Sequence, residues 1–162
     1  MNYLLIGKPN VGKSSIYNIL TASNLNIVHS ESGTTRDWHK EIIKDTNSFI
    51  FDTPGILVND TNTKSILNFD SDSFIQETID IFIYVVDFTD GFNENDKFAI
   101  SRLRKFNKDI ILLINKYDNP KVDFNIEYLK YGVDDILYIS CSHRQGIANL
   151  KSLIDKSINK DK

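Results

Sequence analysis

Residues 7–14 read G-K-P-N-V-G-K-S, which has the spacing G-x-x-x-x-G-K-[S/T] of a phosphate-binding loop. Gly7 and Gly12 let the backbone wrap with its N–H groups pointing inward, and a helix that follows the loop adds the partial positive charge of its N-terminus. Lys13 would bring a point charge to the β- and γ-phosphates, and the Ser14 hydroxyl can ligate Mg²⁺. The alternative is an accidental glycine-rich turn, and the loop alone leaves ATP and GTP undecided.

A second polar motif, Asp52-Thr53-Pro54-Gly55, comes at the end of a predicted strand. An Asp at this place can hold Mg²⁺, usually through water, while the N–H of Gly55 can meet a γ-phosphate. In isolation D-T-P-G is an ordinary turn. Its position after a buried strand and downstream of a phosphate-binding loop favours the functional interpretation.

Two further motifs follow the last predicted strands. Residues 115–118 read N-K-Y-D, and the Asp118 carboxylate can accept from both N1–H and the exocyclic amine of guanine, a pair that adenine lacks. Two such bonds are worth about 3–6 kcal/mol, or roughly 10²–10⁴ in preference for guanine. Residues 140–142 read S-C-S, and a backbone N–H there can reach the guanine O6. Open α/β sheets bind ligands at the carboxyl ends of their strands, so this placement favours a guanine site.

The segment 33–37, G-T-T-R-D, lies in one of two long predicted connections, residues 24–38 and 53–70. Loops of that length are functional or disordered in most compact domains. A Thr hydroxyl here can complete a Mg²⁺ shell only while a γ-phosphate is present, which would make the loop a switch. Without the phosphate-binding loop, a polar surface loop would explain the segment equally well.

Short apolar stretches alternate with helical spacing along the chain. Strands are predicted at residues 3–6, 42–43, 49–51, 81–86, 110–114 and 136–139, and helices at residues 14–20, 95–106 and 147–158. All seven glycines fall in predicted connections. Strands 81–86 and 110–114 lack polar alternation, as expected for a parallel sheet covered on both faces. The sequence predicts an α/β fold, an open parallel sheet with helices on both faces.

Composition narrows the class of protein. The chain has 162 residues, 41% of them apolar, which suits one globular domain with a sizeable core. With 19 basic and 22 acidic residues, the net charge of −3 argues against a nucleic-acid-binding domain. The single cysteine, Cys141, excludes an intrachain disulfide. The apolar start, residues 3–6, is too short for a signal peptide or a membrane span, so we expect a cytoplasmic protein without membrane contact.

Together, GKPNVGKSS, GTTRD, DTPG, NKYD and SCS resemble the five G motifs of the Ras-like P-loop GTPases (TRAFAC class), from residue 4 to about residue 158. P-N-V-G-K-S and T-T-R-D are similar to the bacterial Era/MnmE/Der group, and within it the pattern resembles the first G domain of the Der (EngA) family. The resemblance implies a six-stranded, mostly parallel sheet, GTP and GDP as ligands, and slow Mg²⁺-dependent GTP hydrolysis. It also implies a part in assembly of the large ribosomal subunit, an RNA-protein assembly, through domains absent here. We expect residues 1–160 to form a single, monomeric G domain, an excised N-terminal domain of a larger protein.

The resemblance also assigns the site residues. Lys13, Thr35 and Gly55 would be catalytic, and Ser14, Thr35 and Asp52 would bind Mg²⁺, while Asn10 matches an Asn associated with K⁺ next to the phosphates. The implied nucleotide contacts are Asn10, Val11, Gly12, Lys13, Ser14, Ser15, Asp52, Gly55, Asn115, Lys116, Asp118, Ser140, Cys141 and Ser142.

Three positions depart from the resemblance. Pro54 stands where first Der domains commonly have Gly, and Cys141 replaces the usual Ala. Ile56 occupies the place of the water-orienting Gln of Ras-type enzymes, and its side chain cannot hydrogen-bond a water. Two alternatives therefore stay open, the G domain of an MnmE-like tRNA-modification GTPase and a module that holds GTP or GDP with negligible turnover.

Overall fold

The computed structural model describes residues 1–7, 11–22, 39–52, 69–89, 91, 94–116 and 132–160, with the backbone alone for 69–72 and 157–160. Six strands and four helices lie in these residues. The strands are β1 (Asn2–Gly7), β2 (His39–Ile42), β3 (Phe49–Asp52), β4 (Ile81–Asp87), β5 (Asp109–Asn115) and β6 (Asp135–Tyr138). The helices are α1 (Lys13–Thr21), α2 (Phe69–Thr78), α3 (Glu94–Arg104) and α4 (Ile147–Lys160).

The strands form one sheet in the order β2-β3-β1-β4-β5-β6. Every neighbouring pair is parallel except β2 and β3. From β1 the chain adds β3 on one side of the sheet and then β4 on the other, so the direction in which strands are added reverses at β1. Open α/β sheets bind their ligands at such a reversal. Because five strands run the same way, their carboxyl ends meet at one edge, where Gly7, Asp52, Asp87 and Asn115 each end a strand.

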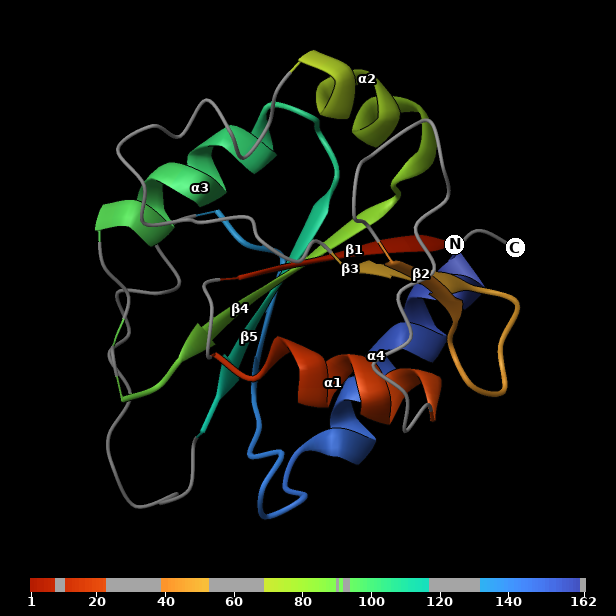
Figure 1. Cartoon of the computed structure of the whole chain (residues 1–162), viewed down its shortest axis with the longest axis vertical. Helices are drawn as coiled ribbons and strands as arrows, with labels where there is room; N and C mark the ends of the chain where they lie inside the picture. Colours follow the sequence, from red (N-terminus) through yellow and green to blue (C-terminus); the bar gives the residue numbers. More distant parts are fainter. Residues whose placement is uncertain are drawn as a thin grey trace.

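Two hydrophobic clusters cover the two faces of the sheet. One joins the strands to Ile75 of α2 and Ile100 of α3, and the other joins them to Ile16 of α1 and Ile154 of α4. Figure 1 shows the same division, with α2 and α3 above the sheet and α1 and α4 below it. The central strands β4 and β5 are apolar without alternation because both of their faces are buried. The predicted α/β fold, a mostly parallel six-stranded sheet with helices on both faces, is confirmed.

Three details of the prediction were wrong. The second strand occupies His39–Ile42 rather than residues 42–43, because the chain turns after Ile42: Ile43 donates its N–H to the Ser48 carbonyl, and Asp45 adopts a φ of 65°. Helix α2 was not predicted at all. Gly7 is the last residue of β1 and not part of a connection.

No helix in the described part of the chain combines the length and the apolar content needed to cross a membrane. The two long connections, residues 24–38 and 53–68, lie outside the described residues.

Candidate nucleotide-binding site

The phosphate-binding end of the site is the start of α1. Gly12 precedes the helix with a φ of 94°, in the left-handed region that favours glycine, and its carbonyl accepts from the Ile16 N–H at 3.1 Å. Gly12 has no side chain with which to cap this helix end, and the first turn of α1 holds no acidic residue. The N–H groups of residues 13–15 therefore present partial positive charge that suits an anion.

Gly12 is also required by a close approach between two loops. A Cβ added at this position would lie 2.1 Å from Nδ2 of Asn115. The phosphate-binding loop and the end of β5 are thus in direct contact, and any side chain at position 12 would push them apart.

Lys13 contacts the end of β3. Its Nζ lies 3.3 Å from Oδ1 of Asp52, and both side chains are largely shielded, with 12% and 14% of their surface exposed. The contact follows from the fold, because β1 and β3 are paired with Leu5 opposite Asp52. The sequence prediction that Lys13 and Asp52 belong to one site agrees with this placement.

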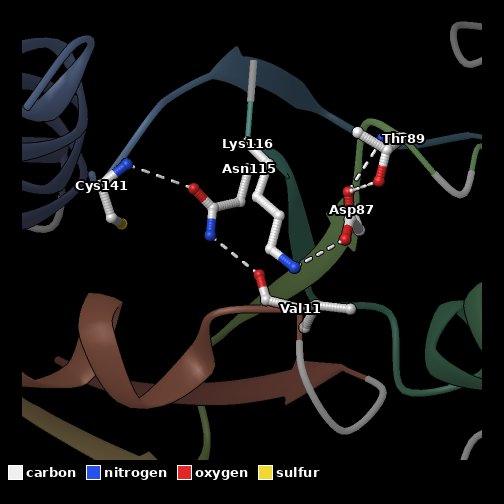
Figure 2. Close-up of polar contacts among 6 residues, drawn as sticks. All are labelled: Val11, Asp87, Thr89, Asn115, Lys116 and Cys141. Carbon is white, nitrogen blue, oxygen red and sulfur yellow. Dashed lines mark hydrogen bonds and ion pairs between the residues drawn. The ribbon is translucent and has the colours of Figure 1, made fainter. Parts of the chain in front are cut away.

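Asn115 joins three segments at the edge of the sheet (Figure 2). Its amide Nδ2 donates to the Val11 carbonyl at 2.8 Å, and its Oδ1 accepts from the Cys141 N–H at 3.3 Å. Asn115 is buried, with 2% exposure; its bond to Val11 is buried, and its bond from Cys141 is partly buried. Val11 follows β1, Asn115 ends β5 and Cys141 follows β6, so one amide fixes the spacing of all three loops.

Lys116 and Asp87 form an ion pair that sequence reasoning missed. The Lys116 Nζ lies 2.8 Å from Oδ2 of Asp87, whose other oxygen accepts from the N–H of Thr89 at 2.8 Å and from its Oγ1 at 2.6 Å. Figure 2 draws these contacts beside the Asn115 bonds. Burial alone would raise the pKa of the Asp87 carboxyl, but hydrogen bonds from Lys116 and Thr89 outweigh it and lower the pKa below the usual 3.8. The sequence feature that could have indicated this pair is the aspartate at the end of the apolar strand β4.

The segment 140–142 lies beside these groups. Ser140 is fully buried, exchanges two backbone hydrogen bonds of 3.0 Å with Gln145, and its Oγ accepts from the His143 N–H at 3.3 Å. Its Oγ also lies 3.3 Å from that of Ser142. Burial raises the pKa of the half-buried Cys141 thiol, so it stays protonated at neutral pH. The Cys141 N–H is bonded to Oδ1 of Asn115, and a contact between a backbone N–H of segment 140–142 and the guanine O6 stays a prediction.

The described residues include two of the three predicted Mg²⁺ ligands. Ser14 is exposed in the first turn of α1, next to Lys13, which contacts Asp52. A hydroxyl and a carboxylate are hard oxygen donors of the kind Mg²⁺ binds, so these residues fit the ion. Among the residues that the structure describes, no group of three or more His, Cys, Asp or Glu side chains could hold a metal by itself.

The structure brings most of the predicted site residues to one edge of the sheet. Described there are Val11, Gly12, Lys13, Ser14, Ser15, Asp52, Asn115, Lys116, Ser140, Cys141 and Ser142. Asn10, Thr35, Gly55 and Asp118 lie outside the described residues, as does Ile56.

Comparison with known proteins decides the family. Residues 2–116 match the family described as 50S ribosome-binding GTPase. The chain belongs to this GTPase family. Its curated relatives include GTPase Der of Mycoplasma capricolum, 35% identical over 160 residues, and GTPase Der of Rickettsia typhi, 39% identical over 149 residues. The alignments cover 97% and 90% of this chain but 37% and 33% of those proteins, so the GTPase chain spans about a third of their length.

Solved structures agree with the fold of this GTPase. The FeoB G-domain from Methanococcus jannaschii is 25% identical with a TM-score of 0.68, over 98% of this chain and 97% of that one. Era, solved with MgGDPNP and a segment of 16S ribosomal RNA, is 26% identical with a TM-score of 0.69. That alignment covers 96% of this chain and 55% of Era. The resemblance to a Ras-like P-loop G domain is therefore confirmed.

Proposed function

We propose that this chain is a G domain that binds GTP and GDP and hydrolyses GTP slowly. The observation that carries the proposal is the direct contact between the phosphate-binding loop and the N-K-x-D motif. Asn115 bonds to the Val11 carbonyl at 2.8 Å, and Gly12 is packed against the same amide. One nucleotide can then be held by both motifs, with its phosphates on α1 and its base beside β5.

At the phosphate end, the N–H groups of residues 13–15 and the Lys13 ammonium would hold the β- and γ-phosphates. Ser14, Asp52 and Thr35 would hold Mg²⁺. When bound, the ion neutralises charge that develops on the phosphate oxygens. The Lys13–Asp52 contact would be exchanged for contacts of Lys13 with phosphate. Lys13 already stands at this end of the sheet, 3.3 Å from Asp52, which supports the exchange.

At the base end, Lys116 and Asp118 would contact guanine, and Asn115 would fix the loop that carries them. Asp118 supplies the two acceptors that discriminate guanine from adenine, with Ser140, Cys141 and Ser142 closing the site on the side of β6. Asp118→Asn should then move the preference from guanine toward xanthine nucleotides. Unchanged specificity in that variant would contradict the assignment of the base site.

Hydrolysis is expected to be slow because Ile56 cannot orient the attacking water. Catalysis would rest on charge neutralisation by Lys13 and on positioning by Thr35 and the Gly55 N–H. We expect an intrinsic hydrolysis rate nearer to the ~10⁻⁴ s⁻¹ of unassisted Ras than to the assisted rate of several turnovers per second. A turnover above roughly one per second from the isolated chain would contradict this expectation.

The experiment that tests the proposal is single-turnover GTP hydrolysis with Mg²⁺. Lys13→Ala should reduce the rate by roughly 10²–10³-fold, as when one preorganised donor is lost. Lys151→Ala is the matched control, because Lys151 is exposed on α4 and away from the site. If the Lys13→Ala variant hydrolysed GTP at the wild-type rate, the proposal would be overturned. Wild-type protein that binds GTP and never hydrolyses it would favour the nucleotide-holding module.

Two finer proposals come from the relatives. The Der relatives and the Era complex with 16S ribosomal RNA support a role in ribosomal subunit assembly, which would need parts of the protein outside this chain. The Asn at position 10 supports activation by K⁺ beside the phosphates. Equal hydrolysis rates in K⁺ and Na⁺ would refute the second proposal, and sedimentation with a GDP–aluminium fluoride mimic tests whether the domain stays monomeric.

A further inference from the structure

The buried carboxylate of Asp87 contacts Lys116 and Thr89 at the base end of the site. Its side chain is 6% exposed, whereas that of Lys116 is 42% exposed. One oxygen faces the Lys116 Nζ at 2.8 Å, and the other accepts two hydrogen bonds from Thr89. The lysine therefore reaches inward to a fixed anion, and the anion cannot turn away without breaking both Thr89 bonds.

The backbone around this pair is fixed as well. Asp87 and Asn115 are partners in the β4–β5 register, and the Phe88 N–H donates to the Asn115 carbonyl at 2.9 Å. Lys116 has a φ of 61°, a left-handed conformation that costs a lysine about 1–2 kcal/mol. Such strain persists only where the surroundings hold the residue in place. The Asn115 bonds and the Asp87 ion pair hold it from both sides.

A purely stabilising role does not explain the pair. Taking the Asp87 carboxylate out of water is costly, and an ion pair whose lysine is 42% exposed gains little stability from the attraction between the charges. What this pair does supply is one defined geometry. Here that geometry belongs to the two residues that begin the N-K-x-D motif.

We propose that Asp87, held by Thr89, is a positioning residue for guanine-nucleotide binding that acts through the Lys116 side chain. The inference rests on the proposed function, because it presupposes that the motif 115–118 contacts the base. By fixing the Lys116 side chain before the nucleotide arrives, Asp87 removes an ordering cost from binding. Its loss should therefore weaken nucleotide binding and leave the phosphate chemistry intact.

The test measures GDP binding by Asp87→Asn in the full 162-residue chain, by fluorescence with a labelled GDP. Asn keeps an oxygen for Thr89 but removes the charge that faces Lys116. We expect GDP affinity to fall roughly 10–100-fold, as when the supporting partners of metal ligands are removed, with most of the change in the dissociation rate. The hydrolysis rate constant of bound GTP, measured in a single turnover, should stay within about twofold of wild type.

A double variant shows whether Asp87 acts through Lys116. If it does, Asp87→Asn combined with Lys116→Met should bind GDP as weakly as Lys116→Met alone. Additive losses would indicate a general structural role and would overturn the inference. Asp96→Asn is the matched control. Asp96, on α3, is also a buried carboxylate, 1% exposed, but it accepts from the Tyr84 hydroxyl of β4 and has no contact with Lys116 in the described residues, so GDP affinity should not change.

The remaining outcomes are also decisive. A folded Asp87→Asn that binds GDP like wild type would overturn the inference while leaving the proposed function intact. Wild-type protein that fails to bind GDP would overturn both. If Asp87→Asn does not fold, Thr89→Val replaces it, since Val removes the Oγ1 donor and keeps the ion pair. A roughly twofold to tenfold rise in the GDP dissociation rate supports the inference, and an unchanged rate refutes it.

Discussion

At the scale of single residues, the site depends on the Asn115 amide and on the absence of a side chain at position 12. The amide bridges loops that follow three different strands, and Gly12 lets the phosphate-binding loop come close enough to be bridged. Both features concern the relative placement of loops. A substitution here should therefore disturb phosphate binding and base binding together.

Gly12→Ala tests this contact. The new Cβ would lie 2.1 Å from Asn115 Nδ2, and the φ of 94° at this position, already left-handed, would become strained. Gly91 is the control: its φ is also left-handed, at 72°, but a Cβ there would meet no atom within 4 Å. Gly91→Ala should cost only the backbone strain of about 1–2 kcal/mol. Gly12→Ala should cost more than that and abolish GDP binding. Equal losses of unfolding free energy in urea, with nucleotide binding intact, would show that the contact is unimportant.

The charge of Asp87 gives a pH-dependent prediction. Its pKa is lower in the folded protein than the usual 3.8, so its contribution to stability is present above about pH 4 and is lost as the pH falls through the lower folded value. The difference in unfolding free energy between wild type and Asp87→Asn should be constant from about pH 5 to 7 and shrink below about pH 4. Urea unfolding across this range measures it. A difference that grows toward acid would contradict the assigned direction.

Sequence patterns predicted some of these residues and not others, for a physical reason. Lys13, Ser14, Asp52 and Asn115 stand in motifs whose spacing is set by the phosphate and the base that they are expected to bind. Asp87 acts on another side chain, so its position depends on how β4 and β5 pair, and no local spacing records that pairing. For the same reason the Asn115–Cys141 bond was not predicted.

At the scale of elements, apolar stretches located all six strands, while α2 was missed. Its segment, FDSDSFIQET, is rich in Asp and Ser, which favour turns and caps over helix interiors. Ile75 within the helix and Ile79 after it are fully buried against the sheet, so tertiary packing stabilises a helix that propensity does not predict. The ends of β2 were misplaced because an edge strand has few apolar residues to mark them.

Helix α3 is attached to the sheet by a hydrogen bond that can be removed. The Tyr84 hydroxyl of β4 donates to Oδ1 of Asp96 in the first turn of α3 at 2.7 Å, and both residues are buried. Burial and the neighbouring Asp96 carboxylate raise the pKa of Tyr84 far above its usual range, so it remains a donor at all working pH values.

Tyr84→Phe should lower the free energy of unfolding by about 1–3 kcal/mol, because a buried carboxylate loses a donor. Denaturant unfolding measures the loss. Asp96→Asn keeps an acceptor for the hydroxyl and should cost less. If Asp96→Asn proves the more harmful of the two, the charge rather than the hydrogen bond anchors the helix.

At the scale of the whole molecule, a single sheet carries every described group of the site on one edge, and its two faces are used for packing. Strand order explains why motifs far apart in the sequence meet there: β1, β3, β4 and β5 are neighbours whose ends point the same way. The account therefore depends on one arrangement. Lys13 and the N-K-x-D motif must serve opposite ends of one guanine nucleotide.

Calorimetric titration of the chain with GDP and with ADP, in the presence of Mg²⁺, tests that arrangement most directly. The account predicts saturable binding of GDP at one site and an affinity for ADP lower by at least ~10²-fold. Lys13→Ala should weaken GDP binding, since the phosphate end loses its point charge. Equal binding of the two nucleotides, or binding of ADP without GDP, would contradict the account.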